Sequence, residues 1–135
     1  MTPRRINVRK VPADDYPGRW KKALERLGAM EDLLKSGSLD SAMVLAVHAA
    51  IAACDSFTTA HRGEVASSDR HLDAWHVFTR VARVQGSGEA QTHLERLLRE
   101  KSRTEYSDRY PNRDEAEGLC GHARRFVRFV EKNLK

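Results

Sequence analysis

The stretch Leu39-Asp-Ser-Ala-Met-Val-Leu-Ala-Val-His-Ala-Ala-Ile-Ala-Ala-Cys-Asp55 decides the fold class, because it leaves almost no polar side to a helix. A helix that is apolar nearly all round is buried in a protein core. Its many alanines let neighbouring helices approach closely. We therefore expect a central buried helix over residues 39–60, with Ser38 as its N-terminal cap.

Two polar residues, His48 and Asp55, interrupt this apolar surface one heptad apart. Buried polar groups in proteins are nearly always hydrogen-bonded. The pair is therefore interpreted as a satisfied core pair. The other interpretation is that both residues line a cleft.

Further amphipathic segments flank the central stretch. Apolar residues at helical spacing, bounded by breaks that contain Gly or Pro, predict helices over residues 17–35, 69–84, 89–106 and 113–134. Nothing in the sequence is typical of a strand or a hairpin. The sequence thus predicts an all-α fold, an antiparallel up-and-down bundle of about five helices in one domain over residues 16–135.

The net charge of +5 is unevenly distributed along the chain. Residues 1–35 carry +4, residues 36–98 carry −2 and residues 99–135 carry +3. Residues 1–15 have no hydrophobic period and include four basic residues, so we expect a flexible basic N-terminal arm. Positive ends favour polyanionic partners such as RNA, DNA or nucleotides, although an ordinary solvated surface has the same composition.

Composition also indicates a soluble, cytoplasmic protein with no membrane partner. The longest apolar run, residues 42–54, is shorter than the roughly 20 residues that span a bilayer. The charged first ten residues do not have the pattern of a secretory signal. Cys54 and Cys120 lie in apolar, helix-patterned stretches without a CxxC motif, so we expect two reduced, buried thiols.

The best-marked surface is the basic turn between the last two predicted helices, residues 101–113. Its candidate residues for binding a ligand or a nucleic acid are Lys101, Arg103, Tyr106, Arg109 and Arg113. Arg can grip phosphate with two hydrogen bonds, and Tyr can stack on a base. The N-terminus of the last helix adds a dipole that favours anions.

Acidic residues close to the basic turn support a second interpretation. The group comprises Glu105, Asp108, Asp114 and Glu115. These carboxylates can pair with the arginines, which makes the turn a structural ion-pair network. Asn112 with Glu115 three residues later also forms a capping-box pattern for the last helix, and Tyr106 is expected at the edge of the core.

The order of the segments over residues 16–134 resembles a known family. The alanine-rich helix is followed by Asp69-Arg-His71, by Leu97 to Tyr106, and by a last helix with Ala123-Arg-Arg-Phe126. This combination resembles the HEPN domain, named for nucleotide binding in higher eukaryotes and prokaryotes. The resemblance implies a helical bundle that often dimerises. It also implies either an RNase of a toxin or defence system, or a binding module that has lost activity.

Active members of that family carry an Arg, four to six further residues and then a His at the start of the final core helix. Arg103 stands at that position here, and Asp108, Arg109 and Tyr110 follow where the His is expected. The departure argues against family-type catalysis. The spacing does occur at Arg70-His-Leu-Asp-Ala-Trp-His76, in a different helix, so Arg70 and His76 are the alternative catalytic pair.

These observations favour a non-catalytic module that binds a nucleic acid, a nucleotide or a protein partner. A metal-independent endoribonuclease and a purely structural dimeric protein remain the alternatives. The resemblance also suggests a toxin–antitoxin pair with a nucleotidyltransferase-like protein. We expect a homodimer, and the exposed part of the last helix around Phe129 is the candidate dimer face.

No motif points to a metal or a cofactor. The sequence has no phosphate loop, no dinucleotide fingerprint and no nucleophile elbow. Asp73 and His76 share one predicted helix face, but the Glu-x-x-His pairs of di-iron bundles do not occur. We therefore expect neither a metal ion nor a cofactor.

Overall fold

The structure is a computed structural model that describes residues 7–67 and 71–134. Its helices are α1 Tyr16–Ser36, α2 Leu39–Arg62, α3 His71–Val81, α4 Ser87–Arg99, α5 Lys101–Tyr106 and α6 Arg113–Asn133. Strands β1 Val8–Lys10 and β2 Glu64–Ala66 form a small antiparallel sheet, and η1 Ala13–Asp15 is a 3-10 helix. The predicted all-α fold class is confirmed, with this sheet as an addition.

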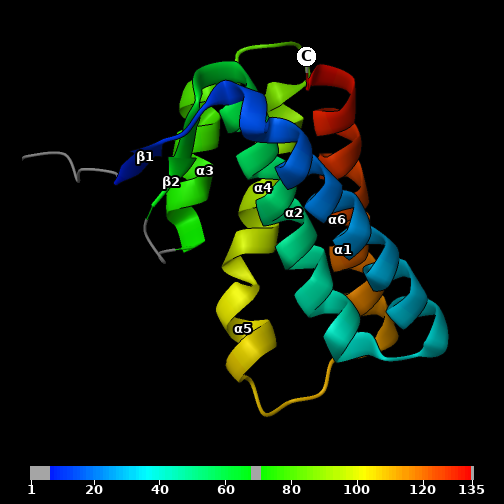
Figure 1. Ribbon diagram of the computed structural model, residues 1–135. Coiled ribbons are helices and arrows are strands. Elements are labelled where there is room, and N and C mark those ends of the chain that lie inside the picture. Colours follow the sequence, from blue (N-terminus) through cyan, green and yellow to red (C-terminus); the bar gives the residue numbers. More distant parts are fainter. Residues whose placement is uncertain (1–6, 68–70, 135) are drawn as a thin grey trace, which may run out of the picture.

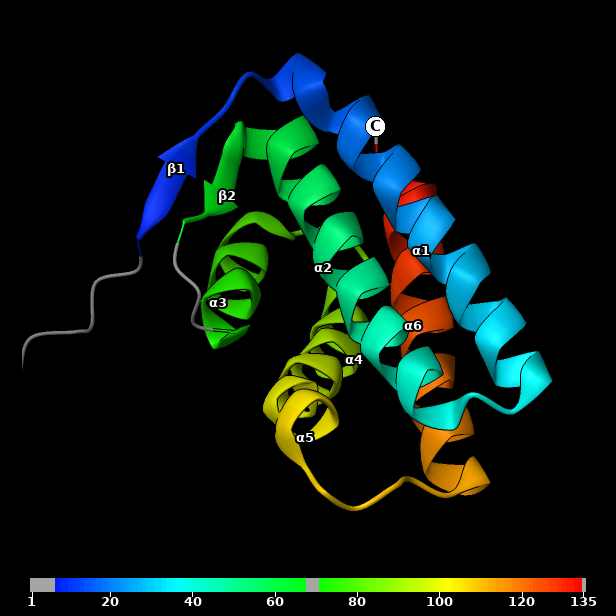
Figure 2. The same cartoon turned by 60° about the horizontal axis from the view of Figure 1, so that its bottom comes forward.

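Helix α2 occupies the centre of the bundle, as the sequence predicts. Figures 1 and 2 show α1 and α6 along one side of it and α3 and α4 along the other. Ala42, Ala46 and Ala53 on α2 have no exposed surface. By length and composition α2 could cross a membrane, but 72% of its most apolar window is buried inside the fold. Its apolar surface therefore serves the core, which is consistent with a soluble protein.

An aromatic cluster joins the helices at the opposite end from the basic turn. Phe57, Phe78 and Phe126 are fully buried, and the ring centroids of Phe78 lie 5.2 Å from those of both other residues. Phe129 packs at 5.9 Å from Phe57. Phe129 is thus half-buried against the core, whereas the sequence suggested that it stood on an exposed dimer face.

Glycines end the first two helices where the sequence places breaks. Gly37 and Gly63 adopt left-handed backbone conformations, with φ of 84° and 62°. A Cβ atom on Gly63 would lie 2.7 Å from the carbonyl oxygen of Val11. Only glycine therefore permits the N-terminal segment to cross so close to the end of α2. The predicted capping box is confirmed, since the Glu115 amide donates to Asn112 Oδ1 over 2.9 Å.

The sheet corrects two predictions made from the sequence, that the chain has no strand and that residues 1–15 form a flexible arm. Val8–Lys10 pairs with Glu64–Ala66 in a register that sets Arg9 opposite Val65. Residues 8–10 are therefore a strand and not part of a flexible arm, whereas residues 1–6 lie outside the described part. Strands of three residues are too short to show an alternating pattern, and the two are far apart in the sequence.

Predicted helix four is two helices, interrupted at Glu100. Within α5 the buried position belongs to Thr104, and the Tyr106 side chain is 78% exposed. The expectation of a core-edge Tyr106 is therefore wrong. The physical reason is helical spacing. In a helix with 3.6 residues per turn, a residue nine positions after Leu97 lies on the opposite side, so Tyr106 faces away from the core. Predicted helix three ends early, at Val81.

A buried carboxylate fastens the sheet to α3. Glu64 accepts hydrogen bonds from Lys10 Nζ over 2.7 Å and from Arg80 Nη2 over 2.8 Å. Its side chain is only 7% exposed. The hydrogen bond from Lys10, and then that from Arg80, holds the pKa of Glu64 below its usual value.

We expect Glu64→Gln to lower the free energy of unfolding by about 1.5–3 kcal/mol at pH 7, the range for a hydrogen bond to a charged group. Because the pKa of Glu64 is lowered by folding, its carboxylate stabilises the folded state at pH values above the pKa of the unfolded chain. This stabilisation is lost as the pH falls through the lowered pKa. The loss should therefore shrink towards pH 4 in urea titrations. Glu117→Gln, which removes an exposed pair with Arg113, should change stability by less than about 0.5 kcal/mol. Equal losses in both variants would contradict this role for Glu64.

Candidate functional site

Glu115 forms ion pairs with two arginines of the predicted basic turn. Arg109 Nη1 donates to Glu115 Oε1 over 2.9 Å, and Arg103 Nη2 lies 3.4 Å from Glu115 Oε2. Arg103 also pairs with Glu100 at 3.6 Å. The bond from Arg109, followed by that from the Asn112 amide, lowers the pKa of Glu115 to about 2. The ion-pair interpretation of the turn therefore describes how these two arginines are held.

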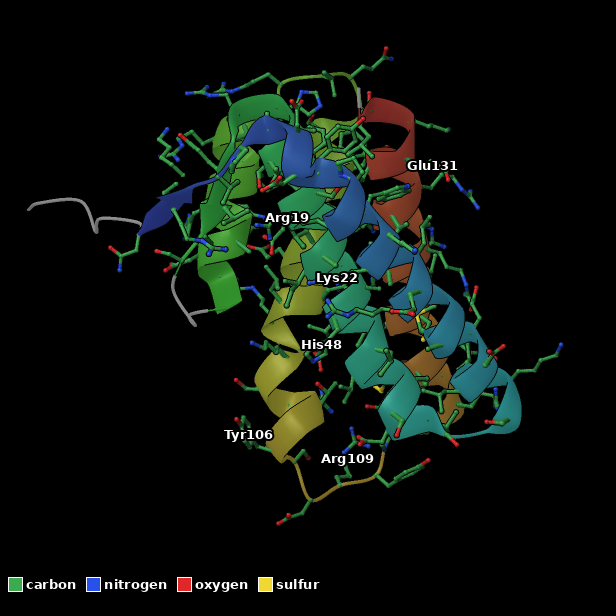
Figure 3. All side chains as sticks on the ribbon, in the orientation of Figure 1. Arg19, Lys22, His48, Tyr106, Arg109 and Glu131 are labelled. Carbon is green, nitrogen blue, oxygen red and sulfur yellow. The ribbon has the colours of Figure 1, made fainter. Side chains whose placement is uncertain are left out.

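The other candidates of the turn point in different directions. Arg113 donates to the Leu34 carbonyl over 3.3 Å and so joins α6 to the end of α1. Tyr106 projects into solvent at the tip of α5, as Figure 3 shows. Lys101 is half-buried and lines none of the cavities along α4, α5 and α6. Of the five predicted residues, Arg103 lines a cavity of about 290 Å³ among the described helices.

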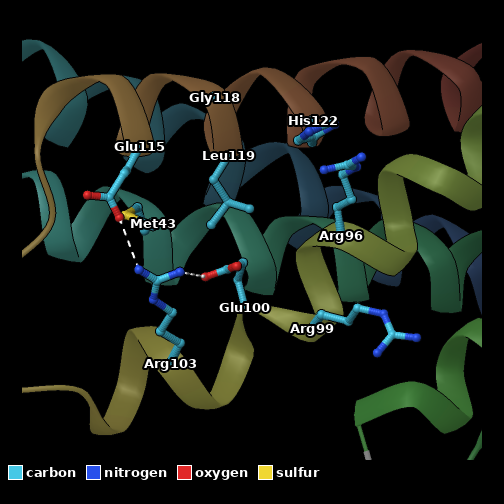
Figure 4. Close-up of a pocket in the computed structure, with 9 residues that line it drawn as sticks. All are labelled: Met43, Arg96, Arg99, Glu100, Arg103, Glu115, Gly118, Leu119 and His122. Atoms are coloured by element: carbon cyan, nitrogen blue, oxygen red, sulfur yellow. Dashed lines mark hydrogen bonds and ion pairs between the residues drawn. The ribbon is translucent and has the colours of Figure 1, made fainter.

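That cavity, the arginine pocket, lies between α6 on one side and α4 and α5 on the other, with the start of α2 behind (Figure 4). Its volume is about 290 Å³. It is lined by Met43, Arg96, Arg99, Glu100, Arg103, Glu115, Gly118, Leu119 and His122. Three of these residues are arginines from α4 and α5, so the pocket has a cationic rim.

The three arginines differ in how far their charge is compensated. Arg99 pairs with Glu95 at 3.3 Å, and Arg103 is held between Glu100 and Glu115. Arg96 forms no ion pair with any other residue that the structure describes. Its side chain rises from α4 towards His122 in Figure 4. Arg96 is therefore the side chain best placed to receive an anion.

The floor of the pocket is apolar, and at Gly118 it has no side chain. Met43 and Leu119 supply its apolar surface. A Cβ atom on Gly118 would meet no other heavy atom within 4 Å. Glycine in a helix interior costs roughly 0.5–1 kcal/mol relative to alanine, and packing offers no reason for it at this position. It leaves a stretch of α6 backbone exposed to whatever enters the pocket.

A histidine pair joins α4 to α6 beside the arginine pocket, and His122 of this pair lines the pocket. His93 Nδ1 on α4 and His122 Nδ1 on α6 lie 2.8 Å apart, so one ring N–H donates a hydrogen bond to the other ring nitrogen. Burial is the main reason that the pKa of each is lowered. Arg125 adds to the effect at His93, and His93 and Arg96 add to it at His122. Both rings are thus held towards the neutral form beside arginines that would attract an anion.

The proposed cleft residues do not take part in this site. Asp55 and His48 lie on α2 and line neither the arginine pocket nor the other cavities along α4, α5 and α6. Burial raises the pKa of Asp55 to about 6, and the nearby charge of Arg19 opposes that shift. Asp55 is therefore a carboxyl whose charge is costly in the folded protein.

The alternative catalytic pair lies only partly within the described part of the chain. Arg70 lies outside the described residues. His76 is on α3, with its ring edge-on to Trp75 at 5.1 Å, and lines no part of the arginine pocket. Within residues 7–67 and 71–134, no group of three or more His, Cys, Asp and Glu side chains is placed to hold a metal ion.

Sequence reasoning missed Arg96, Arg99, His93 and His122. A signal was present, because His93, Arg96 and Arg103 repeat at intervals of three and seven residues on one helix face. Their partner His122 lies 29 residues from His93. No local pattern connects the two helices, so only the packing of α4 on α6 brings the histidines together.

Replacing Asp55 by Asn should stabilise the protein at neutral pH. Because folding raises the pKa of Asp55, its protonated carboxyl stabilises the folded state fully at pH values below the pKa of the unfolded chain. This stabilisation is lost as the pH rises through about 6. Asp55→Asn should therefore gain about 1–3 kcal/mol over the wild type at pH 7.5 and almost nothing at pH 4. Urea titrations at both pH values measure this, with exposed Asp32→Asn as the control. A less stable variant at pH 7.5 would show that attraction to Arg19 outweighs burial.

The histidine pair should make the fold sensitive to mild acid. Since both pKa values are lowered, the unfolded chain binds protons more readily, and stability falls as the pH drops through about 6.5 and below. We expect the double variant His93→Gln/His122→Gln to lose less stability than the wild type between pH 7.5 and 5.5. Thermal unfolding at several pH values measures the slope. The exposed His61→Gln serves as the control, and identical slopes in all three proteins would refute the pair's role.

Comparison with known proteins covers nearly the whole bundle. The family described as HEPN domain matches residues 16–133, from the first residue of α1 to the last of α6. No curated protein and no solved structure matches the chain at a significant level. The matched region includes the arginine pocket and every helix that surrounds it. The chain therefore belongs to the HEPN domain family.

Proposed function

We propose that this HEPN domain is a binding module that holds a phosphate group of a nucleotide or a nucleic acid in the arginine pocket. One observation carries the proposal: Arg96, Arg103 and His122 surround one cavity, and Arg96 has no acidic partner among the described residues. A cationic rim above an apolar floor suits a ligand with a charged end and a flat apolar end.

Each part of the pocket has a chemical role in this proposal. The Arg96 guanidinium offers two parallel N–H groups to a phosphate, a geometry that Lys does not provide. Arg103 joins it by exchanging one carboxylate contact for a phosphate oxygen. The base then lies over Met43 and Leu119 and against the bare backbone at Gly118.

The first test is the affinity for AMP and for a short RNA, measured by calorimetry in wild type and variants. Arg96→Gln should weaken binding about tenfold or more, because a charge-assisted hydrogen bond contributes roughly 1.5–3 kcal/mol. The control is Arg62→Gln, the same change of charge at the far end of α2, on the order of 28 Å from Met43 by helix rise. Equal affinities in all three proteins would refute the pocket as the site.

Alanine substitutions at two glycines distinguish an effect on ligand binding from an effect on stability. Gly28 on α1 and Gly118 on α6 both lie within helices, and a Cβ atom on either would touch nothing within 4 Å. Gly28→Ala and Gly118→Ala should each raise stability by roughly 0.5–1 kcal/mol. Only Gly118→Ala should weaken binding, because only its methyl group enters the pocket. Unchanged binding in Gly118→Ala would place the base elsewhere.

The second candidate function is metal-independent cleavage of RNA at the same pocket. Arg96 beside a His122 held towards its neutral form is an arrangement that can both bind a phosphate and accept a proton. Incubation of varied RNAs with the pure protein and a chelator tests it. Cleavage that His122→Ala abolishes would establish this activity, whereas cleavage that only His76→Ala abolishes would assign it to the Arg70–His76 segment.

Our proposals on assembly and location are supported by family membership alone. The proposed partners are a second copy of the chain and a nucleotidyltransferase-like protein, in a cytoplasmic toxin–antitoxin or defence pair. Light scattering on the pure protein measures the mass in solution. A stable dimer that binds neither AMP nor RNA would support the third function, a purely structural interaction protein.

A further inference from the structure

We propose that the arginine pocket is one end of a longer groove along the seam between α4 and α6, and that the groove holds a single strand of nucleic acid. This inference rests on the proposed function and specifies its ligand. A second cavity of about 280 Å³ forms the other end, and we call it the Phe129 pocket. Its main lining residues are Gly86, Glu89, His93, Arg125, Arg128 and Phe129, with Lys132 beside them.

The histidine pair joins the two cavities. His122 lines the arginine pocket, His93 lines the Phe129 pocket, and their Nδ1 atoms lie 2.8 Å apart. The cavities therefore share one wall. On α4 they extend from Glu89 to Arg99, ten residues or on the order of 15 Å by helix rise. A single phosphate group cannot contact both ends of that distance.

The Phe129 pocket is also lined by cations without acidic partners. Arg125, Arg128 and Lys132 project from successive turns of α6. None of the three forms an ion pair with another residue in the described part of the chain. Glu89 is the one acidic residue in the lining. Such a row of uncompensated positive charge attracts a chain of phosphates.

Both cavities combine the same two surfaces. Phe129 gives the second cavity an apolar floor, as Met43 and Leu119 do in the first. Phe129 is fixed in place, because its ring packs on Phe57 at 5.9 Å and on Phe78 at 6.1 Å. Two sites of similar size, each with an apolar floor and a cationic rim, match the repeating base and phosphate of an oligonucleotide.

A single strand fits this groove better than other polyanions do. Cavities of this size admit individual bases, whereas a duplex presents its phosphates on a wide, stacked cylinder. An acidic peptide would satisfy the cations but has no regular flat groups for the two apolar floors. The groove thus favours an unpaired strand with at least one base in each cavity.

The experiment compares AMP with fluorescein-labelled oligoadenylates of two to eight nucleotides, by fluorescence anisotropy with the intact chain. Affinity should rise with length until the strand reaches both cavities and should then level off. Arg128→Gln/Lys132→Gln should weaken binding of the longer strands by about tenfold or more and leave AMP binding unchanged. Losing two phosphate contacts should also reduce the slope of log affinity against log salt by roughly 1.4.

The matched control carries the same loss of two charges away from the seam, Lys22→Gln on α1 (Figure 3) with Arg62→Gln on α2. It should bind all strands like the wild type. Circular dichroism establishes that both double variants are folded, as expected for exposed side chains that form no ion pair with another described residue.

Three outcomes would overturn the inference. If AMP binds and depends on Arg96 but affinity does not grow with strand length, the proposed function stands and the groove does not. If polyglutamate of equal charge competes as well as an oligonucleotide, the seam is a surface for acidic peptides. If neither AMP nor any strand binds, the proposed function itself fails, and the groove with it.

Discussion

The burial of the alanine-rich surface of α2 is the constraint on which the rest of the structure depends. Its alanines present no side chain longer than a methyl group, so α1 and α6 can lie close against it, and Met30 and Phe126 are excluded from water at these contacts. Because α2 has almost no polar side, every neighbouring helix must turn its own apolar stripe inwards. The polar and charged residues of those helices are then left at the outer surface and at the seams between them.

The seam between α4 and α6 follows from that requirement. Helix α4 contributes leucines to the core, and α6 contributes leucine, phenylalanine and valine side chains. The residues next to these stripes meet one another across the seam. At the end of the seam next to α5, Arg103 forms an ion pair with Glu100, and Arg109 forms one with Glu115. Further along, the histidine pair and Arg96 meet without a carboxylate. The seam thus has arginines paired with carboxylates at one end. Beyond that end lie Arg96, Arg125, Arg128 and Lys132, which form no ion pair with another described residue.

The sequence predicted the central helix, the breaks at Gly37 and Gly63 and the capping box because each depends on residues near one another in the chain. It failed for the sheet, where three-residue strands pair across a long separation, and for Tyr106, whose position nine residues after Leu97 faces away from the core. The predicted basic turn contributed only Arg103 to the arginine pocket. Its other arginines are directed elsewhere by Glu115 and by the Leu34 carbonyl, a choice among partners that spacing alone does not reveal.

By itself, the sequence determined that the chain forms a helical bundle around an alanine-rich helix and that its positive charge lies towards the two ends. Hydrophobic period, helix caps and glycine breaks act over a few residues, so they can be recognised without coordinates. Only the tertiary structure decided which cations keep an acidic partner and which do not. It brought His93 and His122 from separate helices to 2.8 Å and placed Arg96 beside them. Those are distances between helices, and they depend on how the apolar stripes of α4 and α6 pack together against α2.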